Sequence, residues 1–244
     1  MIRIAIAVIF LISFLIISVI IQLIEEIVGL FSKEAKAKSS LAIVNWAFRV
    51  ILLISGTKVT VKGEENVPKD EAVLYIINHR GFFDILITYV RVPRPTGYVA
   101  KIEMLKYLTL TKWMKNLYCE FMDRSDLRKG MVAINNCAEK IKKGISIAIF
   151  PEGTRNKTEE PLLDFHKGSF KIAEKTNCKI VPVVLCNTSA IFEDHLPLIK
   201  KQHVVLEYLP VVDVAAMDRE ERKNLCDMVR EQMKEAYIRN LPLV

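Results

Sequence analysis

The stretch AVLYIINHRGFFDILITYV, residues 72–90, decides the fold. Its first six residues, 72–77, are continuously apolar, which is typical of a strand that is buried on both faces of a parallel sheet. Polar residues follow at once, and residues 84–90 then have helical character. A buried strand that turns directly into a helix is the building unit of α/β sheets, so this stretch favours that class.

Working outward, short β-rich runs alternate with helical ones along the rest of the chain. The further predicted strands are residues 59–61, 98–100, 145–150, 180–185 and 203–209, and the further predicted helices are residues 126–142 and 166–175. This alternation predicts an α/β fold with a mixed, largely parallel central sheet flanked by helices.

A closing helix is predicted near the end of the chain. Asp218 and Glu221 have the spacing of a capping box, and apolar residues then recur at helical spacing. The pattern indicates an amphipathic helix that packs on the sheet.

The N-terminal region contains one apolar segment that differs from the rest of the chain. Residues 4–24 carry no charge, and 18 of these 21 residues are hydrophobic. As a helix the segment would be about 31 Å long, close to the hydrocarbon thickness of a bilayer. A cleaved signal peptide is the competing interpretation, but the run is long for one and no small-residue cleavage site follows it. We expect a membrane anchor that either spans the bilayer or lies in one leaflet.

A second apolar stretch, residues 41–55, is interrupted by Asn45 and Arg49 and ends at Gly56. It predicts an interfacial or core-docked helix, because fifteen residues with a central arginine are poorly suited to spanning. We therefore expect an anchor region over residues 1–56 and a catalytic domain over residues 57–244. The lysines at residues 33–38 favour a cell-membrane protein whose catalytic domain lies on the cytoplasmic side.

Composition narrows the classes of partner. The chain has 35 basic and 28 acidic residues, a net charge of +7. The basic residues are scattered without interleaved aromatic residues, so we expect no nucleic-acid partner but an anionic membrane surface and an anionic substrate. The five cysteines and the remaining histidines lack metal-ligand spacing, which predicts neither a metal site nor a bound cofactor.

His79 and Asp84 follow the strand of residues 72–77 and are the first candidate catalytic residues. On a straight helix two residues at this spacing point about 140° apart, so they can meet only if the backbone turns between them, which Gly81 would permit. A carboxylate on one imidazole nitrogen would leave the other nitrogen as a general base. From the spacing alone, a structural histidine at a turn explains the pair equally well.

The second candidate segment, residues 150–155, reads FPEGTR and also follows a buried strand. Arg155 would place an anion-binding guanidinium at the same edge of the sheet. Without other information, this segment could be an ordinary surface turn.

Together the two segments resemble the glycerolipid acyltransferases, most closely the small bacterial 1-acyl-glycerol-3-phosphate acyltransferases. The resemblance covers residues 59–188 and includes the N-H-x-x-x-x-D and F-P-E-G-T-R motifs. Residues 121–124 (FMDR) stand where the family has F-I-D-R, and residues 181–184 (VPVV) match its V-P-V strand. Residues 101–103 (KIE) resemble its K-x-E element, and residues 165–168 (FHKG) resemble its F-x-x-G helix start.

The departures from the family pattern are Met122, Met104 and Glu120. The two methionines are tolerable apolar exchanges. Glu120 stands where a small or apolar residue is usual, and the sequence does not explain it.

The resemblance implies that His79, oriented by Asp84, removes the proton from a glycerol hydroxyl that attacks an acyl thioester. It further implies substrate-binding roles for Glu152, Gly153, Thr154 and Arg155, with Lys101 and Arg124 as supporting cations. We expect Arg155 to bind the phosphate, and Glu152 to orient Arg155 or to bond a glycerol hydroxyl. Alternatively, Arg124 could be a structural ion-pair partner of Asp123 or of another neighbour.

The implied reaction converts lysophosphatidic acid to phosphatidic acid, with acyl-CoA or acyl carrier protein as the donor and membrane phospholipids around the site. An enzyme nucleophile is not needed, and Ser146 is expected within a strand rather than on a nucleophile elbow. The open alternatives are glycerol 3-phosphate or another lysophospholipid as acceptor, a thioesterase, and a membrane lipid-binding protein without turnover. Oligomeric state and acyl-chain preference are not predicted.

Overall fold

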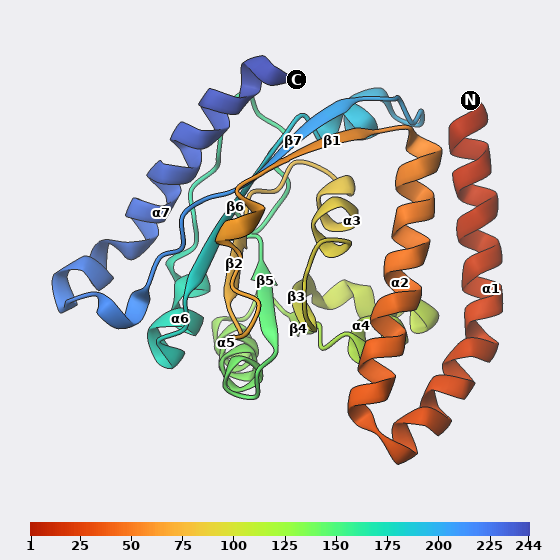
Figure 1. The fold of residues 1–244 in the computed structure, drawn as a ribbon, viewed down its shortest axis with the longest axis horizontal. Coiled ribbons are helices and arrows are strands. Elements are labelled where there is room, and N and C mark those ends of the chain that lie inside the picture. The colour runs from red at the N-terminus through yellow and green to blue at the C-terminus, as the bar shows by residue number, and fades with distance from the viewer.

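The computed structural model describes residues 1–244, and its centre is a seven-stranded sheet (Figure 1). The strand order is β1-β7-β6-β2-β5-β3-β4. All neighbouring strands pair in parallel except β6 and β7, which are antiparallel. The strands are β1 (Lys58–Lys62), β2 (Leu74–Ile77), β3 (Thr96–Lys101), β4 (Glu120–Met122), β5 (Ser146–Ile149), β6 (Ile180–Cys186) and β7 (His203–Tyr208). The predicted mixed, largely parallel sheet is confirmed.

Helices cover both faces of this sheet. In Figure 1, α6 (Lys171–Thr176) and α7 (Arg219–Asn240) lie to the left of the sheet, and α1 (Ile2–Phe31), α2 (Lys33–Ser55) and α3 (Phe83–Tyr89) lie to its right. The remaining helices are α4 (Leu108–Asn116) and α5 (Leu127–Lys142). The closing helix α7 begins at the predicted capping box, whose two reciprocal hydrogen bonds are both present.

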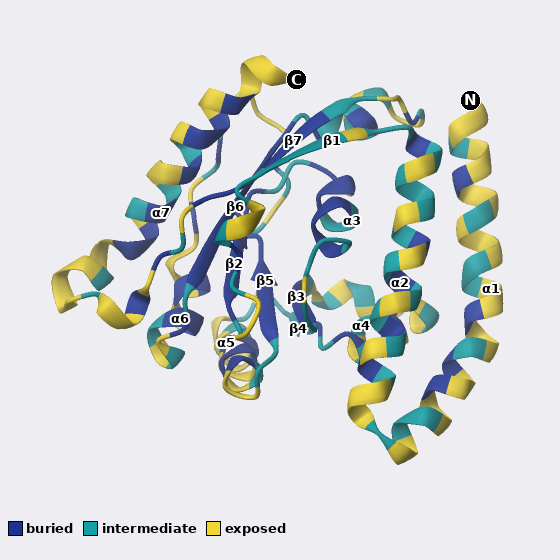
Figure 2. Cartoon of the chain, in the orientation of Figure 1, coloured by how far each residue is buried: buried dark blue, intermediate teal, exposed yellow.

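Strand β2 shows why its sequence is continuously apolar. Leu74 and Ile76 point into the core on the α5, α6 and α7 face, whereas Tyr75 and Ile77 point into the core on the other face. Because successive side chains alternate between faces, a strand with both faces covered has no polar positions. The strands at the centre of the sheet are accordingly the most buried part of the molecule (Figure 2).

Two elements were not predicted from the sequence, namely strand β4 and helix α4. Strand β4 is a three-residue edge strand whose residues are only partly buried, so it lacks the apolar run that marks the other strands. The structure also explains Glu120. Its carboxylate pairs with Lys140 of α5 at 2.6 Å and accepts a hydrogen bond from Asn136, so it fastens α5 to the sheet edge.

The N-terminal region forms a hairpin of two long helices that runs along one side of the sheet domain. Helix α2 begins at Lys33, eight residues before the predicted stretch, and ends at Gly56 in the left-handed conformation with φ of 69°. The hairpin is docked by polar contacts. Gln22 donates to the backbone of Thr109 on α4, and Asn116 of α4 donates to Ser40. Within the hairpin, Glu25 accepts from Ser40. Both helices are long and apolar enough to cross a membrane.

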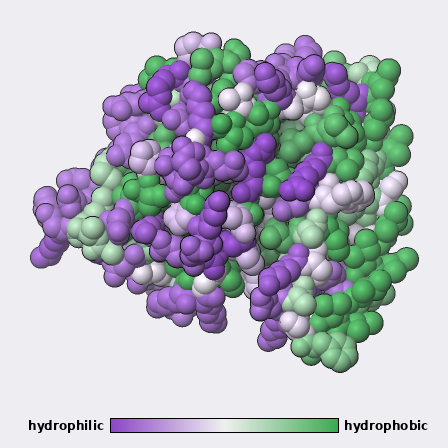
Figure 3. All heavy atoms as spheres, in the orientation of Figure 1, coloured by the Kyte–Doolittle hydropathy of each residue, from purple (hydrophilic) through white to green (hydrophobic).

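The outward face of α1 is a large apolar surface. Ile9, Ile16 and Ile20 are each about two thirds exposed, at 66%, 66% and 65%. In Figure 3 the right-hand side, where the hairpin lies, is covered by hydrophobic residues, whereas the opposite side is mostly hydrophilic. An apolar surface of this extent marks an interaction or membrane face rather than a solvated one.

Candidate active site

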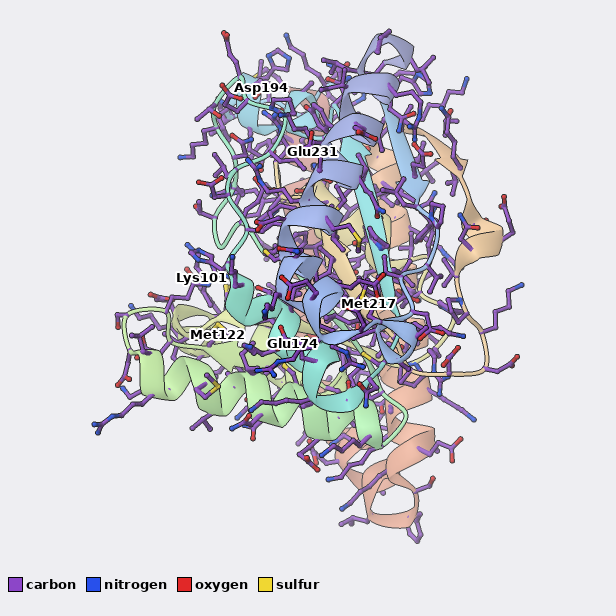
Figure 4. The ribbon with its side chains drawn as sticks, turned by 90° about the vertical axis from the view of Figure 1, so that its left-hand side faces the viewer. Lys101, Met122, Glu174, Asp194, Met217 and Glu231 are labelled. Carbon is purple, nitrogen blue, oxygen red and sulfur yellow. The ribbon has the colours of Figure 1, made fainter.

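The candidate residues gather at one edge of the sheet. Strands β2, β5, β3 and β4 are neighbours and run parallel, so their carboxyl ends lie together. His79, Glu152, Lys101 and Arg124 each stand at or just beyond one of these ends. In Figure 4, Lys101, Met122 and Asp194 all lie towards the left-hand side. Such an edge is where α/β proteins place their ligands.

His79 and Asp84 are in direct contact. The Nδ1 of His79 lies 2.7 Å from Oδ2 of Asp84, which is the second residue of α3 and is fully buried. The same Oδ2 accepts hydrogen bonds from the backbone amides of Arg80 at 2.6 Å and Gly81 at 2.8 Å. Three donors on one oxygen hold the turn between strand and helix, so the geometry that the spacing required is present.

The imidazole of His79 packs on an aromatic ring and is still partly exposed. Its ring stacks on Phe150 with a centroid distance of 4.1 Å, and its side chain keeps 17% of its surface exposed. With the carboxylate accepting Nδ1–H, the Nε2 atom carries the free lone pair. The arrangement can therefore accept a proton from a bound hydroxyl.

The Glu152 carboxylate bonds two backbone amides and not the Arg155 side chain. Its Oε1 accepts from the backbone amide of His79 at 2.7 Å, and its Oε2 accepts from the amide of Leu163 at 2.9 Å. Glu152 makes no direct contact with Arg155, which pairs with Glu193 instead. A bond from Glu152 to a glycerol hydroxyl stays a prediction, because each carboxylate oxygen can accept a second hydrogen bond. Burial raises the pKa of the Glu152 carboxyl, and the two amide bonds oppose that rise.

The partner of Arg155 is Glu193, in the loop after β6. The two side chains form an ion pair at 3.2 Å, and the Arg155 guanidinium lies 4.2 Å from the ring centre of Phe82. Glu193 also accepts from the backbone amide of Phe82 at 2.6 Å. Arg155 is thereby connected to the loop that carries His79.

Gly81 lies directly against the carboxylate of Glu193, a contact that the sequence did not reveal. Its backbone is not in the left-handed region, but a Cβ atom there would lie 2.6 Å from Oε2 of Glu193. The expectation that Gly81 serves to permit the turn is therefore corrected. It leaves room for the carboxylate.

Gly153 and its surroundings form the other side of the site. Gly153 has φ of 71°, and a Cβ atom there would lie 2.7 Å from Nε2 of His166 and 3.7 Å from the guanidinium of Arg124. Arg124 has no ion-pair partner within 4.0 Å, since Asp123 pairs with Lys129 instead. The ion pair of Arg124 with Asp123 is therefore absent, whereas burial lowers the pKa of the Arg124 guanidinium and the nearby charge of Glu103 opposes that fall.

Thr154 and Lys101 are exposed, and neither forms an ion pair or a side-chain hydrogen bond. Ser146 is buried in β5, where its hydroxyl accepts from the amide of Val73, so it has a structural role.

Comparison with known proteins places the chain in a family. A family model described as Acyltransferase matches residues 58–186, more than half of the chain. The chain belongs to the Acyltransferase family. The matched residues span β1 to β6 and contain His79, Asp84, Arg155 and the other candidate site residues.

Curated relatives of this acyltransferase include proteins from distant organisms. It is 31% identical to the 1-acyl-sn-glycerol-3-phosphate acyltransferase of Borreliella burgdorferi over 76% of this chain and 74% of that relative. It is also 31% identical to the enzyme of the same name from Saccharomyces cerevisiae, over 76% of this chain and 62% of the yeast protein.

A solved structure shares the whole fold with this acyltransferase. The 1-acyl-sn-glycerophosphate (LPA) acyltransferase PlsC of Thermotoga maritima superposes with a TM-score of 0.75 at 24% identity. The match covers 97% of both chains, so it includes the N-terminal hairpin.

Two residues at this acyltransferase site were missed by sequence reasoning. Glu193 is separated from both the His79 loop and Arg155 in the chain and belongs to no motif. Arg80 stands inside the first motif, but its guanidinium donates to the carbonyls of Thr158, Glu160 and Pro161 and so holds the loop after Arg155. Every residue has a backbone carbonyl, so the sequence does not indicate which carbonyls will accept these hydrogen bonds.

Proposed function

We propose that this protein transfers an acyl group from an acyl thioester to the free sn-2 hydroxyl of 1-acyl-sn-glycerol 3-phosphate, giving phosphatidic acid for phospholipid synthesis. The observation that carries the proposal is the contact of 2.7 Å between His79 and Asp84, which leaves Nε2 open at the edge of the sheet. The names of the curated relatives support this acceptor.

In the proposed reaction, Nε2 of His79 takes the proton from the sn-2 hydroxyl as its oxygen attacks the thioester carbonyl carbon. The carbon–sulfur bond then breaks, and the leaving thiolate takes the proton from the imidazolium, so the product is a free thiol. Asp84 keeps the imidazole in the correct tautomer and stabilises its protonated form. General-base assistance of this kind contributes about 10²- to 10⁴-fold in rate.

The acceptor phosphate is proposed to lie among the cations around Gly153. Arg155, Arg124 and Lys101 would supply its charge-assisted hydrogen bonds, and each such bond contributes about 1.5–3 kcal/mol. Thr154 would add a hydroxyl donor, and Gly153 would let the backbone approach. Glu152 would act indirectly by holding the backbone of His79. The donor would be acyl-CoA or acyl carrier protein, since both present a thioester.

Residues 1–56 are proposed to hold this site at the cell membrane, with residues 57–244 as the catalytic domain on the cytoplasmic side. The docked hairpin with its apolar outward face supports membrane attachment. Attachment would let the acceptor stay in the bilayer, because moving its acyl chain into water costs about 0.8 kcal/mol per methylene.

The test is an assay of the purified protein in lipid vesicles with an acyl thioester and a panel of lysophospholipids. Thiol release and lipid product are followed separately. We expect product with 1-acyl-glycerol 3-phosphate, and its loss in His79→Ala. The matched control is His203→Ala, whose imidazole bonds Thr60 at the far edge of the sheet and should leave turnover intact. Thiol release without acceptor dependence would indicate a thioesterase, and no release at all would indicate a binding protein.

A further inference from the structure

Glu193 is a carboxylate from outside both motifs that joins the loop after β2, which carries His79, to the loop after β5, which carries Arg155. It stands in the loop after β6 and belongs to neither motif. Its Oε1 accepts from the amide of Phe82, on the loop that carries His79, and from Nη1 of Arg155, on the loop after β5. One side chain therefore connects the general base with the proposed phosphate ligand.

The surroundings of Glu193 hold its carboxylate in one place. The side chain is 14% exposed, and the neighbouring Phe192 packs on Phe82 with ring centres 6.2 Å apart. Gly81 has no Cβ where Oε2 lies, so the backbone of the catalytic loop is fitted to this carboxylate. Oε2 itself is buried and accepts no hydrogen bond from the protein.

Arg155 is oriented but not saturated by these contacts. Glu193 takes one donor, Nη1, at 3.2 Å, while the ring of Phe82 supports the guanidinium plane at 4.2 Å. A guanidinium carries five N–H donors in a rigid fork, so most of them stay free for a ligand. The Arg155 side chain keeps 31% of its surface exposed.

We propose that Glu193 is a positioning residue that fixes the Arg155 guanidinium beside the His79 loop. When Arg155 binds the acceptor's phosphate, the reacting hydroxyl is then placed next to His79. The inference rests on the proposed function, because it names how the acceptor of that same site is oriented. The phosphate uses the free donors of Arg155 while Glu193 keeps Nη1.

A double-mutant cycle on acceptor kinetics tests this role. Glu193→Ala should raise the KM for 1-acyl-glycerol 3-phosphate about tenfold, which equals about 1.4 kcal/mol. In an Arg155→Ala background the same substitution should raise KM no further, because the group through which Glu193 acts is gone. Glu193→Gln keeps a neutral acceptor for both donors and should restore most of the affinity.

Two controls separate positioning from a general structural role. Asp194→Asn removes the exposed neighbouring carboxylate and should leave KM unchanged. 1-Monoacylglycerol lacks the phosphate, so its use should respond equally little to Glu193→Ala and to Arg155→Ala. An equal rise in KM with and without Arg155 would overturn the proposal, and so would a fall in KM, which would mean that Glu193 competes with the phosphate.

A binding measurement keeps this inference separate from the proposed function. The shift of the unfolding temperature by 1-acyl-glycerol 3-phosphate is recorded for each variant without an acyl donor. A smaller shift in Glu193→Ala but not in Asp194→Asn supports positioning even if the wild-type protein shows no transfer. A full shift in Glu193→Ala contradicts it even if transfer is confirmed.

Discussion

Asp84→Asn isolates the charge of the catalytic pair while keeping its shape. The variant keeps one oxygen at the position of Oδ2, because that position faces three donors, from His79, Arg80 and Gly81. The new amide nitrogen then takes the place of Oδ1, which is buried and has no partner. His79 therefore keeps a hydrogen bond at Nδ1 but loses the negative charge that stabilises its protonated form.

The expected magnitudes follow from these contacts. A charge-assisted hydrogen bond contributes about 1.5–3 kcal/mol, and each 1.36 kcal/mol corresponds to about tenfold in rate, so kcat should fall about 10- to 150-fold. The unsatisfied buried amide should lower the free energy of unfolding by about 1–3 kcal/mol. The acceptor KM should stay unchanged, because Asp84 does not face the proposed phosphate ligands.

Steady-state kinetics with separate measurement of thiol and lipid product gives kcat and KM, and chemical unfolding followed by circular dichroism gives the stability. His79→Ala sets the lower limit, since it removes the base altogether. A folded Asp84→Asn protein with wild-type kcat would refute the assignment of His79 and Asp84 as a general-base pair.

Three further predictions concern other parts of the molecule. Glu152→Ala leaves two backbone amides without their acceptor, so the free energy of unfolding should fall by about 2–6 kcal/mol in a denaturation experiment, and an unchanged value would contradict the role of Glu152 as a backbone anchor. Ile16→Asp on the exposed face of α1 should weaken vesicle binding by about 3–4 kcal/mol in a sedimentation assay without changing the unfolding midpoint, whereas undiminished binding would remove this face from the membrane contact. Burial raises the pKa of Glu193 above its ordinary 4.5, so the stability contributed by this group is present below that pH and is lost as pH rises through the folded-state pKa. The free energy of unfolding of Glu193→Gln relative to wild type should therefore rise as the pH rises above about 4.5, and a constant difference would show that Glu193 does not titrate in a buried setting.

The hydrophobic patterns predicted the main architecture because they record burial directly. Strand β2 is apolar at every position since both of its faces are covered, and the capping box of α7 involves residues three apart. Strand β4 escaped prediction because an edge strand of three partly buried residues produces no such pattern. Helix α2 is longer than the predicted stretch of residues 41–55, because it begins at Lys33 with a charged segment that the apolar pattern does not include.

The sequence by itself indicated an α/β protein with an apolar N-terminal segment, and its resemblance to a known family implied that His79 and Asp84 form a pair. These features are local, since each depends on residues within one element or one turn. Only the tertiary structure decided that Glu152 holds backbone amides and that Glu193 holds Arg155. Backbone donors are the same at every residue, and the partner of a buried charge depends on which distant loop returns beside it. Neither contact can be derived from spacing along the chain.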